Sequence, residues 1–454
     1  MAIRLVYINL PLSADEGGFA EVARLWRNGS TLYDGAWADR PQGLLLVFRG
    51  VLSIHDSELA LRAAAIIVSV VLLVVFAGLA RRLVGRRAAL IAVFLLATAG
   101  ASPFIEAYTL SGELLASAFS VGSLFAFVVY LERRHAALIL LAGLLTGSAV
   151  MVKQSGFDAG VAALAYLLWT ERRAALRPVL MLLAGALVAP VLCAVSAPDF
   201  GAWWHAVVAY RFEGDSLFRG GVGYRLMLFF NGLRSAALAL AVPLVLLPGG
   251  WRIAPKLLKL WFVASLIGVL GGGNFWAHYW IQIAPPLCLI AALRLAELLR
   301  QRELRRPLRV APVLAAAVVS VAVSTVPLAG GTERRVEAFT PGDTVRLYDE
   351  EIAAYVRTHT SPNDRILVTP LAGGSIYFLA DRLPAYRFLW YRPAMATPGA
   401  VEELQRVVAE RRASLVVVLA DPSVLDPSGR TTALLKRGYR VVRRVGPTAI
   451  LAPA

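Results

Sequence analysis

Residues 60–104 read ALRAAAIIVSVVLLVVFAGLARRLVGRRAALIAVFLLATAGASPF, two apolar runs separated by a short basic cluster. Each run approaches the roughly 20 apolar residues that a helix needs to cross a hydrocarbon core about 30 Å thick. The cluster between them holds four arginines within seven residues, at positions 81, 82, 86 and 87. Such a cluster is typical of a cytoplasmic loop between two spanning helices, so the stretch predicts a membrane hairpin.

The same alternation continues along most of the chain. Hydrophobic residues make up 58% of the 454 residues, and the mean hydropathy is +0.64. A soluble protein of this length is nearer half apolar and spreads its charge more evenly. We therefore expect a polytopic α-helical membrane protein with about ten spans. After the first two, at 60–80 and 88–104, the expected spans are 114–130, 137–152, 158–170, 178–197, 225–247, 257–271, 280–298 and 309–330.

Basic residues sort the linkers by side of the membrane. Every second linker is rich in Lys and Arg, which places these linkers in the cytoplasm. After the first cluster they carry Arg133 and Arg134; Arg172, Arg173 and Arg177; Arg252, Lys256 and Lys259; and Arg300, Arg302, Arg305, Arg306 and Arg309. The remaining linkers then face outward, namely 1–59, 105–113, 153–157, 198–224, 272–279 and the tail from 331.

Ten spans place both ends of the chain outside. An exported N-terminus without a preceding hydrophobic anchor is unusual, and no cleavable signal peptide is visible before Ser13. We therefore expect that one upstream helix is missing from this start. That helix would give eleven spans and a cytoplasmic N-terminus.

Composition also limits the kinds of chemistry to consider. The net charge of +16 arises from the basic linkers, so we expect no nucleic-acid partner. Cys193 and Cys288 lie inside apolar segments and are interpreted as small core residues without a disulfide. We expect no metal site, because no His, Cys and Asp cluster has ligand spacing. A serine nucleophile is not expected either, because there is no G-x-S-x-G setting.

The tail from residue 331 has a different pattern, typical of an α/β domain. Strand-like runs rich in branched residues occur at Arg365–Thr369, Ser414–Ala420 and Tyr439–Val445. Helical spacing is present at Ala400–Arg412 and near Thr431–Lys436. The sequence therefore divides into a membrane part at 1–330, with its first external loop at 1–59, and an external α/β domain at 331–454.

The first external loop carries two adjacent acids in the stretch Ser13-Ala14-Asp15-Glu16-Gly17-Gly18-Phe19. One interpretation is a helix that begins at a Ser13 cap, has acids in its first turn and runs to about Arg27. The other is catalysis, because the loop continues into Arg40-Pro41-Gln42-Gly43 and an apolar segment at the membrane surface. The local sequence leaves both open.

Three further outward loops carry candidate site residues. Glu106 follows the end of a span, where a carboxylate at membrane depth costs roughly 2.5–3.5 kcal/mol, so we favour a functional role. Glu113 begins the next span and fits a first-turn role as well. Lys153, beside Gln154, is either a snorkelling lysine or a counter-charge for phosphate. In Asn274–Trp280, His278 is a possible donor to an anion, whereas Trp276, Tyr279 and Trp280 also fit an interfacial aromatic belt. His205 also lies on this side, where it could be merely solvated.

Taken together, these motifs resemble the GT-C superfamily of membrane glycosyltransferases. The pattern comprises the Asp15-Glu16 pair, the basic-Pro-x-Gly step from Arg40, acids in the second external loop, Lys153-Gln154, and His278-Tyr279 before a span that contains Pro-Pro. Within the superfamily, residues 10–300 are most similar to protein O-mannosyltransferases, aminoarabinose transferases and lipopolysaccharide-core galacturonosyl transferases. The α/β tail is similar to those of bacterial members.

The resemblance implies a GT-C fold and transfer of a sugar from a polyprenyl-phosphate carrier at the outer face of the cytoplasmic membrane. The acceptor would be a lipid, a cell-envelope glycan or a protein. The resemblance assigns the catalytic acid to the Asp-Glu pair, here Asp15 with Glu16, and the second-loop acid to Glu106, with Glu113 as the fallback. Arg40 keeps the cation of the family's Lys-Pro-Pro-Leu-like step, although the second Pro is absent. We expect the donor to be held by Arg40, Lys153, Gln154, His278, Tyr279 and Glu113.

Elementary chemistry agrees with these assignments. Glycosyl transfer passes through an oxocarbenium-like transition state and needs a base to take the acceptor proton. A lipid-phosphate leaving group needs cations, which Arg40, Lys153 and His278 could supply. The sequence specifies no cofactor, and it leaves open whether a divalent ion assists. A transporter or lipid flippase is the alternative from another class, but we see no internal repeat. An inactive scaffold that binds polyprenyl phosphate is a further alternative.

Overall fold

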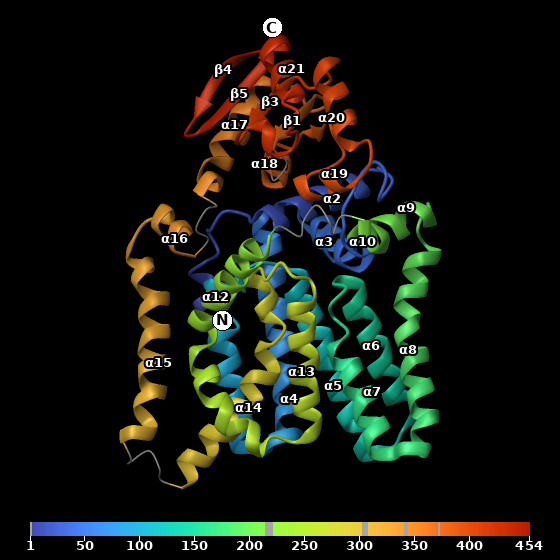
Figure 1. Ribbon diagram of the computed structural model, residues 1–454, viewed down its shortest axis with the longest axis vertical. Helices are drawn as coiled ribbons and strands as arrows, with labels where there is room; N and C mark the ends of the chain where they lie inside the picture. Colours follow the sequence, from blue (N-terminus) through green and yellow to red (C-terminus); the bar gives the residue numbers. More distant parts are fainter. Residues whose placement is uncertain (1, 214–220, 302–306, 340–343, 371–372) are drawn as a thin grey trace.

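The computed structural model describes residues 2–213, 221–301, 307–339, 344–370 and 373–454 (Figure 1). A bundle of long helices forms the lower part of the molecule, and the C-terminal domain with its β-sheet lies at the top. Short helices of the external loops lie between the two. The predicted basic residues Arg302, Arg305 and Arg306 lie outside the described residues.

The predicted hairpin is present as α4 (Glu58–Ala99), which changes direction at Gly85. Gly85 has φ 78° and ψ 167°, a conformation that glycine adopts readily and other residues rarely do. Leu72 and Leu73 before this turn line the same cavity as Leu96 after it, so the two halves lie side by side. The basic cluster surrounds the turn, as the sequence predicted.

The other long helices follow the predicted spans closely. They are α5 (Gly112–Arg133), α6 (Ala136–Val152), α7 (Asp158–Glu171), α8 (Leu176–Val195), α12 (Val222–Ile253), α13 (Lys256–Gly271), α14 (Ala284–Arg300) and α15 (Pro307–Thr325). Four helical stretches among the described residues are long and apolar enough to cross a membrane: Glu58–Ala99, Gly112–Arg133, Asp158–Val195 and Val222–Ile253. Shorter apolar helices occur at Gln42–Ile54, Ala136–Val152 and Ala311–Ala322. Cys193 and Cys288 are buried in α8 and α14, as small core residues should be.

Glycines allow α6 and α8 to pack closely. A Cβ atom added to Gly143 would lie 2.1 Å from the carbonyl oxygen of Leu182, and one added to Gly185 would lie 2.3 Å from that of Leu140. Neither space can hold a methyl group. Small residues at helix contacts are typical of membrane proteins, where tight packing replaces much of the hydrophobic effect between helices.

A buried carboxylate joins three helices within the bundle. Asp158 Oδ1 accepts a hydrogen bond from Ser120 Oγ on α5 at 2.6 Å. Its Oδ2 accepts from Trp261 Nε1 and Ser265 Oγ on α13, both at 2.8 Å. Asp158 is 1% exposed. Three donors therefore satisfy a side chain that would otherwise be costly to bury.

The external layer consists of short elements that rest on the bundle. They are α1 (Ala2–Leu5), α2 (Ala14–Arg27), α3 (Gln42–Ile54), η1 (Pro103–Ile105), α9 (Phe200–Trp204), η3 (His205–Ala209), α10 (Tyr210–Glu213) and η4 (Ala277–Ile281). The N-cap prediction for α2 is confirmed, because Ser13 Oγ accepts from the Glu16 amide at 3.1 Å. The helix ends at Arg27, also as predicted.

The C-terminal domain contains a five-stranded sheet in the order β2-β1-β3-β5-β4. Strand β1 (Arg365–Thr369) pairs in parallel with β2 (Leu383–Pro384) and with β3 (Leu415–Val418), whereas β5 (Thr448–Pro453) is antiparallel to both β3 and β4 (Tyr439–Val445). The three predicted strands are present, and β2 and β5 are additional. The helices are α16 (Thr332–Phe339), α17 (Asp349–His359), α18 (Gly374–Ala380), α19 (Tyr391–Ala396), α20 (Ala400–Ala409) and α21 (Arg430–Gly438).

Candidate active site

A cleft lies where the first two external loops meet the ends of the bundle helices. It gathers charged residues from five separate parts of the sequence. Most of the residues predicted for the site line it, and Thr109 and Ser111 were not predicted. The lining residues are Ser13, Asp15, Glu16, Phe19, Arg40, Glu106, Thr109, Leu110, Ser111, Gly112, Glu113, Lys153 and His278.

Asp15 is the acid best placed to meet an incoming group. It lies in the first turn of α2, and its side chain is 38% exposed. Its Oδ1 accepts a hydrogen bond from Trp390 Nε1 at 3.0 Å, and its Oδ2 lies 3.8 Å from Arg40 Nη2. One carboxylate oxygen is thus held by the C-terminal domain, while the other faces a cation across the cleft.

Glu16 has a different environment from its neighbour. It is 1% exposed, and its Oε2 lies 2.7 Å from Arg62 Nη1. Its Oε1 accepts from the Leu110 amide at 2.9 Å, which ties the first external loop to the second. Burial raises the pKa of Glu16, and Arg62 and the Leu110 amide oppose that rise. These contacts indicate a positioning role, and catalysis by Glu16 stays a prediction.

His278 joins the two acids of the second external loop. Its Nδ1 lies 3.3 Å from Glu106 Oε2, and its Nε2 lies 3.6 Å from Glu113 Oε1. Burial by itself would lower the pKa of His278, but Glu113 and Glu106 outweigh it and raise the pKa to about 9. His278 is therefore a cation at neutral pH.

Lys153 supplies a second cation beside His278. Its Nζ donates to Glu113 Oε1 and lies 3.7 Å from the centroid of the Tyr279 ring. A cation over an aromatic face is favourable, particularly where water is excluded. Tyr279 also packs edge-on against His278, with ring centroids 5.2 Å apart. The predicted pair His278-Tyr279 therefore lies beside Lys153.

Glu106 has an uncommon backbone conformation. Its φ of 51° and ψ of 27° are left-handed, which costs a residue with a Cβ atom about 1–2 kcal/mol. Its carbonyl oxygen accepts from the amide of Thr109 at 3.1 Å and from Thr109 Oγ1 at 2.8 Å, and these bonds hold the turn. Backbone strain of this kind clusters at functional sites. It sets Glu106 apart from an ordinary loop acid.

Arg40 is the third cation of the cleft, and an ion pair with Asp39 holds it in place. Its Nη1 lies 2.6 Å from Asp39 Oδ2, which also accepts from the Tyr210 hydroxyl at 2.7 Å. Its guanidinium lies 5.5 Å from the centroid of the Phe19 ring. Burial would lower the pKa of Arg40, but Asp39 and Asp15 outweigh burial and raise it. Arg40 therefore presents a permanent positive charge to Asp15.

Gln154 and His205 lie outside the lining of the cleft. Gln154 Nε2 donates to the carbonyl oxygens of Asp39 and Val207, both at 3.2 Å, and so fixes two loops beside Arg40. Its role as a ligand stays a prediction. His205 belongs to η3. In the parts of the chain that the structure describes, no group of three or more His, Cys, Asp or Glu is arranged to hold a metal ion.

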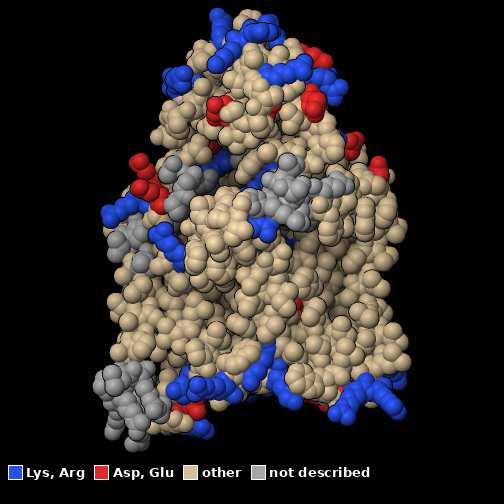
Figure 2. All heavy atoms as spheres, viewed as in Figure 1, with Lys and Arg blue, Asp and Glu red and all other residues tan. Residues whose placement is uncertain are grey.

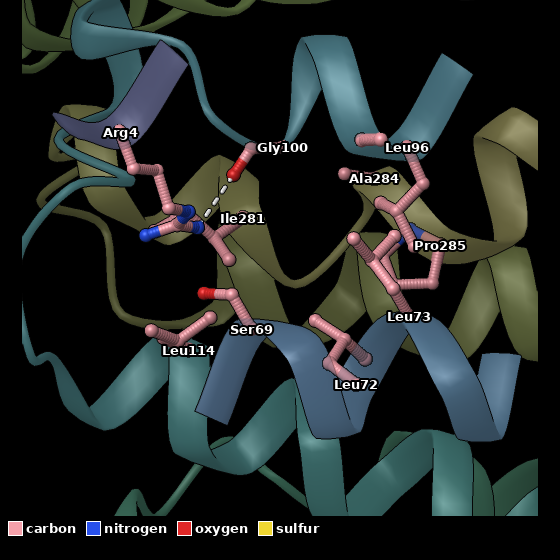
Figure 3. A pocket seen from close by; sticks show the side chains of 11 residues that line it. Arg4, Ser69, Leu72, Leu73, Leu96, Gly100, Leu114, Ile281, Ala284 and Pro285 are labelled. Carbon is pink, nitrogen blue, oxygen red and sulfur yellow. Dashed lines mark hydrogen bonds between the residues drawn. The ribbon is translucent and has the colours of Figure 1, made fainter. Parts of the chain in front are cut away.

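A second, mainly apolar cavity opens among the helices near the cleft (Figure 3). Two of its residues connect it to the cleft: Leu114 directly follows Glu113, and Ile281 lies three residues after His278. Arg4 stands at one end and donates to the Gly100 carbonyl at 2.9 Å. The cavity is lined by Arg4, Ser69, Leu72, Leu73, Leu96, Ala97, Gly100, Leu114, Ile281, Ala284 and Pro285.

Comparisons with known proteins agree with this architecture. Residues 39–197 match the family described as dolichyl-phosphate-mannose-protein mannosyltransferase. The fold is similar to that of ArnT from Cupriavidus metallidurans bound to undecaprenyl phosphate, with a TM-score of 0.63 and 16% identity over 99% of this chain and 96% of that one. It is also similar to the Archaeoglobus fulgidus oligosaccharyltransferase in complex with Zn and sulfate, with a TM-score of 0.57 and 15% identity over 96% and 71% of the chains. A search of curated proteins finds no match.

The helical bundle, the external layer and the C-terminal sheet domain define a multi-pass membrane protein with the GT-C fold. The family match covers residues 39–197, and the similar folds of ArnT and the oligosaccharyltransferase extend over nearly the whole chain. The resemblance stated from the short external motifs is thereby confirmed.

Proposed function

We propose that the protein transfers a sugar from a polyprenyl-phosphate carrier to an acceptor, with Asp15 as the general base. One observation carries this proposal: an accessible carboxylate and three cations share a single cleft. Asp15 takes the proton from the acceptor as the new glycosidic bond forms. Arg40, Lys153 and His278 stabilise the charge that develops on the departing phosphate.

The environment of Asp15 suits a base. Its side chain is 38% exposed, so an acceptor hydroxyl can reach it from the cleft. Because Oδ1 already accepts from Trp390, Oδ2 is the oxygen expected to take the proton. Glu16 is 1% exposed and paired with Arg62, which makes it much less accessible to an acceptor.

The three cations suit a lipid phosphate. Arg40 is ionised at any relevant pH, and the two glutamates keep His278 ionised. Lys153 and His278 are also oriented by their carboxylate partners, so a phosphate would meet donors that are already in place. Preorganised charges of this kind are the largest contribution to catalysis in many enzymes.

The apolar cavity next to the cleft suits the first part of the carrier's hydrocarbon chain (Figure 3). The similar fold of ArnT, whose structure contains undecaprenyl phosphate, supports this choice of carrier. The phosphate would then lie at the ends of the helices, with the lipid chain between them and the sugar in the cleft.

The charge distribution supports an outward-facing cleft. Blue Lys and Arg side chains gather at the lower end of the bundle, opposite the C-terminal domain (Figure 2). Cytoplasmic ends of spanning helices carry such an excess. We infer that the cleft and the C-terminal domain face the outside of the cytoplasmic membrane, where a lipid, a cell-envelope glycan or a protein would serve as acceptor.

Radiolabelled polyprenyl-phosphate sugars incubated with membranes that contain the protein test this proposal. We expect at least one donor to lose its sugar to an acceptor fraction, and we expect Asp15→Asn to stop that transfer. Asp34→Asn is the matched control, because Asp34 is an exposed acid of the same loop that pairs with Arg387 instead. Transfer at the wild-type rate by Asp15→Asn would refute the assigned base. Movement of labelled donor across vesicles without loss of sugar would indicate a flippase instead.

A further inference from the structure

The C-terminal domain contacts the proposed base through the side chain of Trp390. Its Nε1 donates to Asp15 Oδ1 at 3.0 Å, and its ring centroid lies 5.2 Å from that of Phe19. Asp15 and Phe19 both line the cleft. A residue 375 positions away in the sequence therefore contacts the proposed base directly.

Two consecutive glycines in α2 make this contact possible. Glycine is unfavourable inside a helix, so the presence of Gly17 and Gly18 in α2 calls for a structural explanation. A Cβ atom on Gly18 would lie 2.3 Å from Trp390 Cζ2, and one on Gly17 would lie 2.5 Å from Ser375 Cα. The two glycines form a shallow notch that receives the C-terminal domain. The notch directly follows the Asp15-Glu16 pair in the sequence.

A second residue of α2, Arg24, anchors the domain away from the cleft. Arg24 donates to the carbonyl oxygens of Tyr377 and Phe378, both at 3.0 Å, and to Asp381 Oδ1 at 2.7 Å. Its side chain is 8% exposed. The domain is thus fixed to α2 at two points, and the indole of Trp390 is a donor with a defined position.

The residues just after Trp390 contact another loop of the site. Arg392 Nη1 donates to Asn274 Oδ1 at 2.7 Å, and its guanidinium lies 5.1 Å from the centroid of the Trp276 ring. Phe275, between them, has a left-handed φ of 50°. This loop leads directly to His278. The start of α19 therefore bridges the loops that carry the proposed base and one of the proposed phosphate ligands.

We propose that Trp390 is a positioning residue for Asp15, so that the C-terminal domain completes the active site. This proposal rests on the proposed function of Asp15 as the base. The indole N–H occupies one carboxylate oxygen and fixes the plane of the carboxylate, which directs the other oxygen into the cleft. A displacement of about 1 Å in a reacting group can lower a rate about 100-fold, so this contact should matter for turnover.

The first test is Trp390→Phe in the full-length protein reconstituted in vesicles. Phenylalanine keeps a ring against Phe19 but removes the N–H donor. We expect turnover of the labelled donor to fall about 10- to 100-fold. The affinity for undecaprenyl phosphate, used as the binding probe, should stay within about twofold, because the hydrogen bond that the variant loses goes to Asp15 and not to a proposed phosphate ligand.

Trp204→Phe is the matched control. Trp204 is 49% exposed on α9, on the same side of the molecule, and we expect wild-type turnover from this variant. Gly18→Ala disturbs the contact between Trp390 and α2, because the added methyl group has no room beside Trp390. Gly18→Ala should lower turnover, and adding it to Trp390→Phe should lower turnover little further. Wild-type turnover in Trp390→Phe would overturn the proposal.

A double-mutant cycle separates this inference from the proposed function. The melting temperatures of Asp15→Asn, Trp390→Phe and the double variant should be non-additive, because the two side chains contact each other. Additive changes would overturn the role of Trp390, even if the wild-type protein transfers sugar. Non-additive changes in a protein that transfers no sugar would keep the contact and refute the proposed function alone.

Discussion

Asp158 and Asp15 both lie in polar clusters, but the surroundings of these two carboxylates differ. Asp158, inside the bundle, accepts hydrogen bonds from three neutral donors and is 1% exposed. Asp15, in the outer cleft, accepts from one donor, faces Arg40 at 3.8 Å, and has a side chain that is 38% exposed. A carboxylate whose partners are all supplied by packed helices stabilises the fold. One that keeps an accessible oxygen beside cations is available for chemistry.

The largest expected effect is on activity at Asp15. Asp15→Asn keeps an oxygen that can accept from Trp390 but loses the basic carboxylate, so transfer should fall about 10²- to 10⁴-fold. Initial rates with a labelled donor measure this loss. The melting temperature should stay close to the wild-type value, because the side chain is partly exposed. A variant that loses activity only through unfolding would remove the distinction drawn between the two acids.

For substitution of Asp158 we expect the protein to lose stability and to keep its activity. Asp158→Ala leaves the indole N–H of Trp261 buried without its acceptor, which should lower the free energy of unfolding by about 1–3 kcal/mol. Turnover per folded molecule should be retained. Thermal unfolding together with rates normalised to folded protein measures both quantities. Ser148→Ala is the control, because the half-buried Ser148 donates to the carbonyl oxygen of Leu144 in its own helix α6. Loss of turnover in folded Asp158→Ala would assign that acid a functional role as well.

A smaller effect on binding is expected at Lys153. Lys153→Met removes one of the three proposed phosphate ligands, and hydrogen bonds to charged groups contribute about 1.5–3 kcal/mol. We therefore expect the affinity for undecaprenyl phosphate to fall about 10- to 100-fold. Lys153→Arg keeps the charge and should retain most of that affinity. Unchanged binding by Lys153→Met in a direct titration would remove Lys153 from the phosphate site.

The smallest effect is a dependence on pH through His278. The pKa of His278 is raised to about 9 in the folded protein, whereas an unperturbed histidine has a pKa near 6.5. Its stabilising charge is therefore fully present below about pH 6.5 and is lost as the pH rises through about 9. Both the melting temperature and the affinity for undecaprenyl phosphate should decline across that range, and less so in His278→Gln. Identical pH profiles for the two proteins would show that His278 does not carry this charge.

Much of the fold could be predicted because membrane helices have a strong local signal. Apolar runs and arginine clusters located the helices, including the turn of α4 around Gly85, and Ser13 located the start of α2. Strand β5 was not predicted, because Thr448–Pro453 has few β-branched residues and becomes a strand by pairing with β3 and β4. Pairing between distant strands leaves little trace in the local sequence.

The site could be predicted only in part, for a similar reason. Assigning each loop to one side of the membrane placed Asp15, Arg40, Glu106 and Lys153 on the same side. The structure gathers these residues in one cleft. The partner of Glu16 was not predicted, because Arg62 lies within an expected membrane span. Trp390 was not predicted either, because the position of the C-terminal domain depends on packing against α2 and not on any motif.

A structure of the protein with undecaprenyl phosphate bound tests the central claim most directly. We predict that the phosphate lies in the cleft, within hydrogen-bonding distance of at least two of Arg40, Lys153 and His278, with Asp15 exposed toward the acceptor side. The hydrocarbon chain should enter the apolar cavity beside Leu114. A phosphate bound elsewhere, with the cleft closed by its own ion pairs, would contradict the assignment of this cleft as the site of sugar transfer.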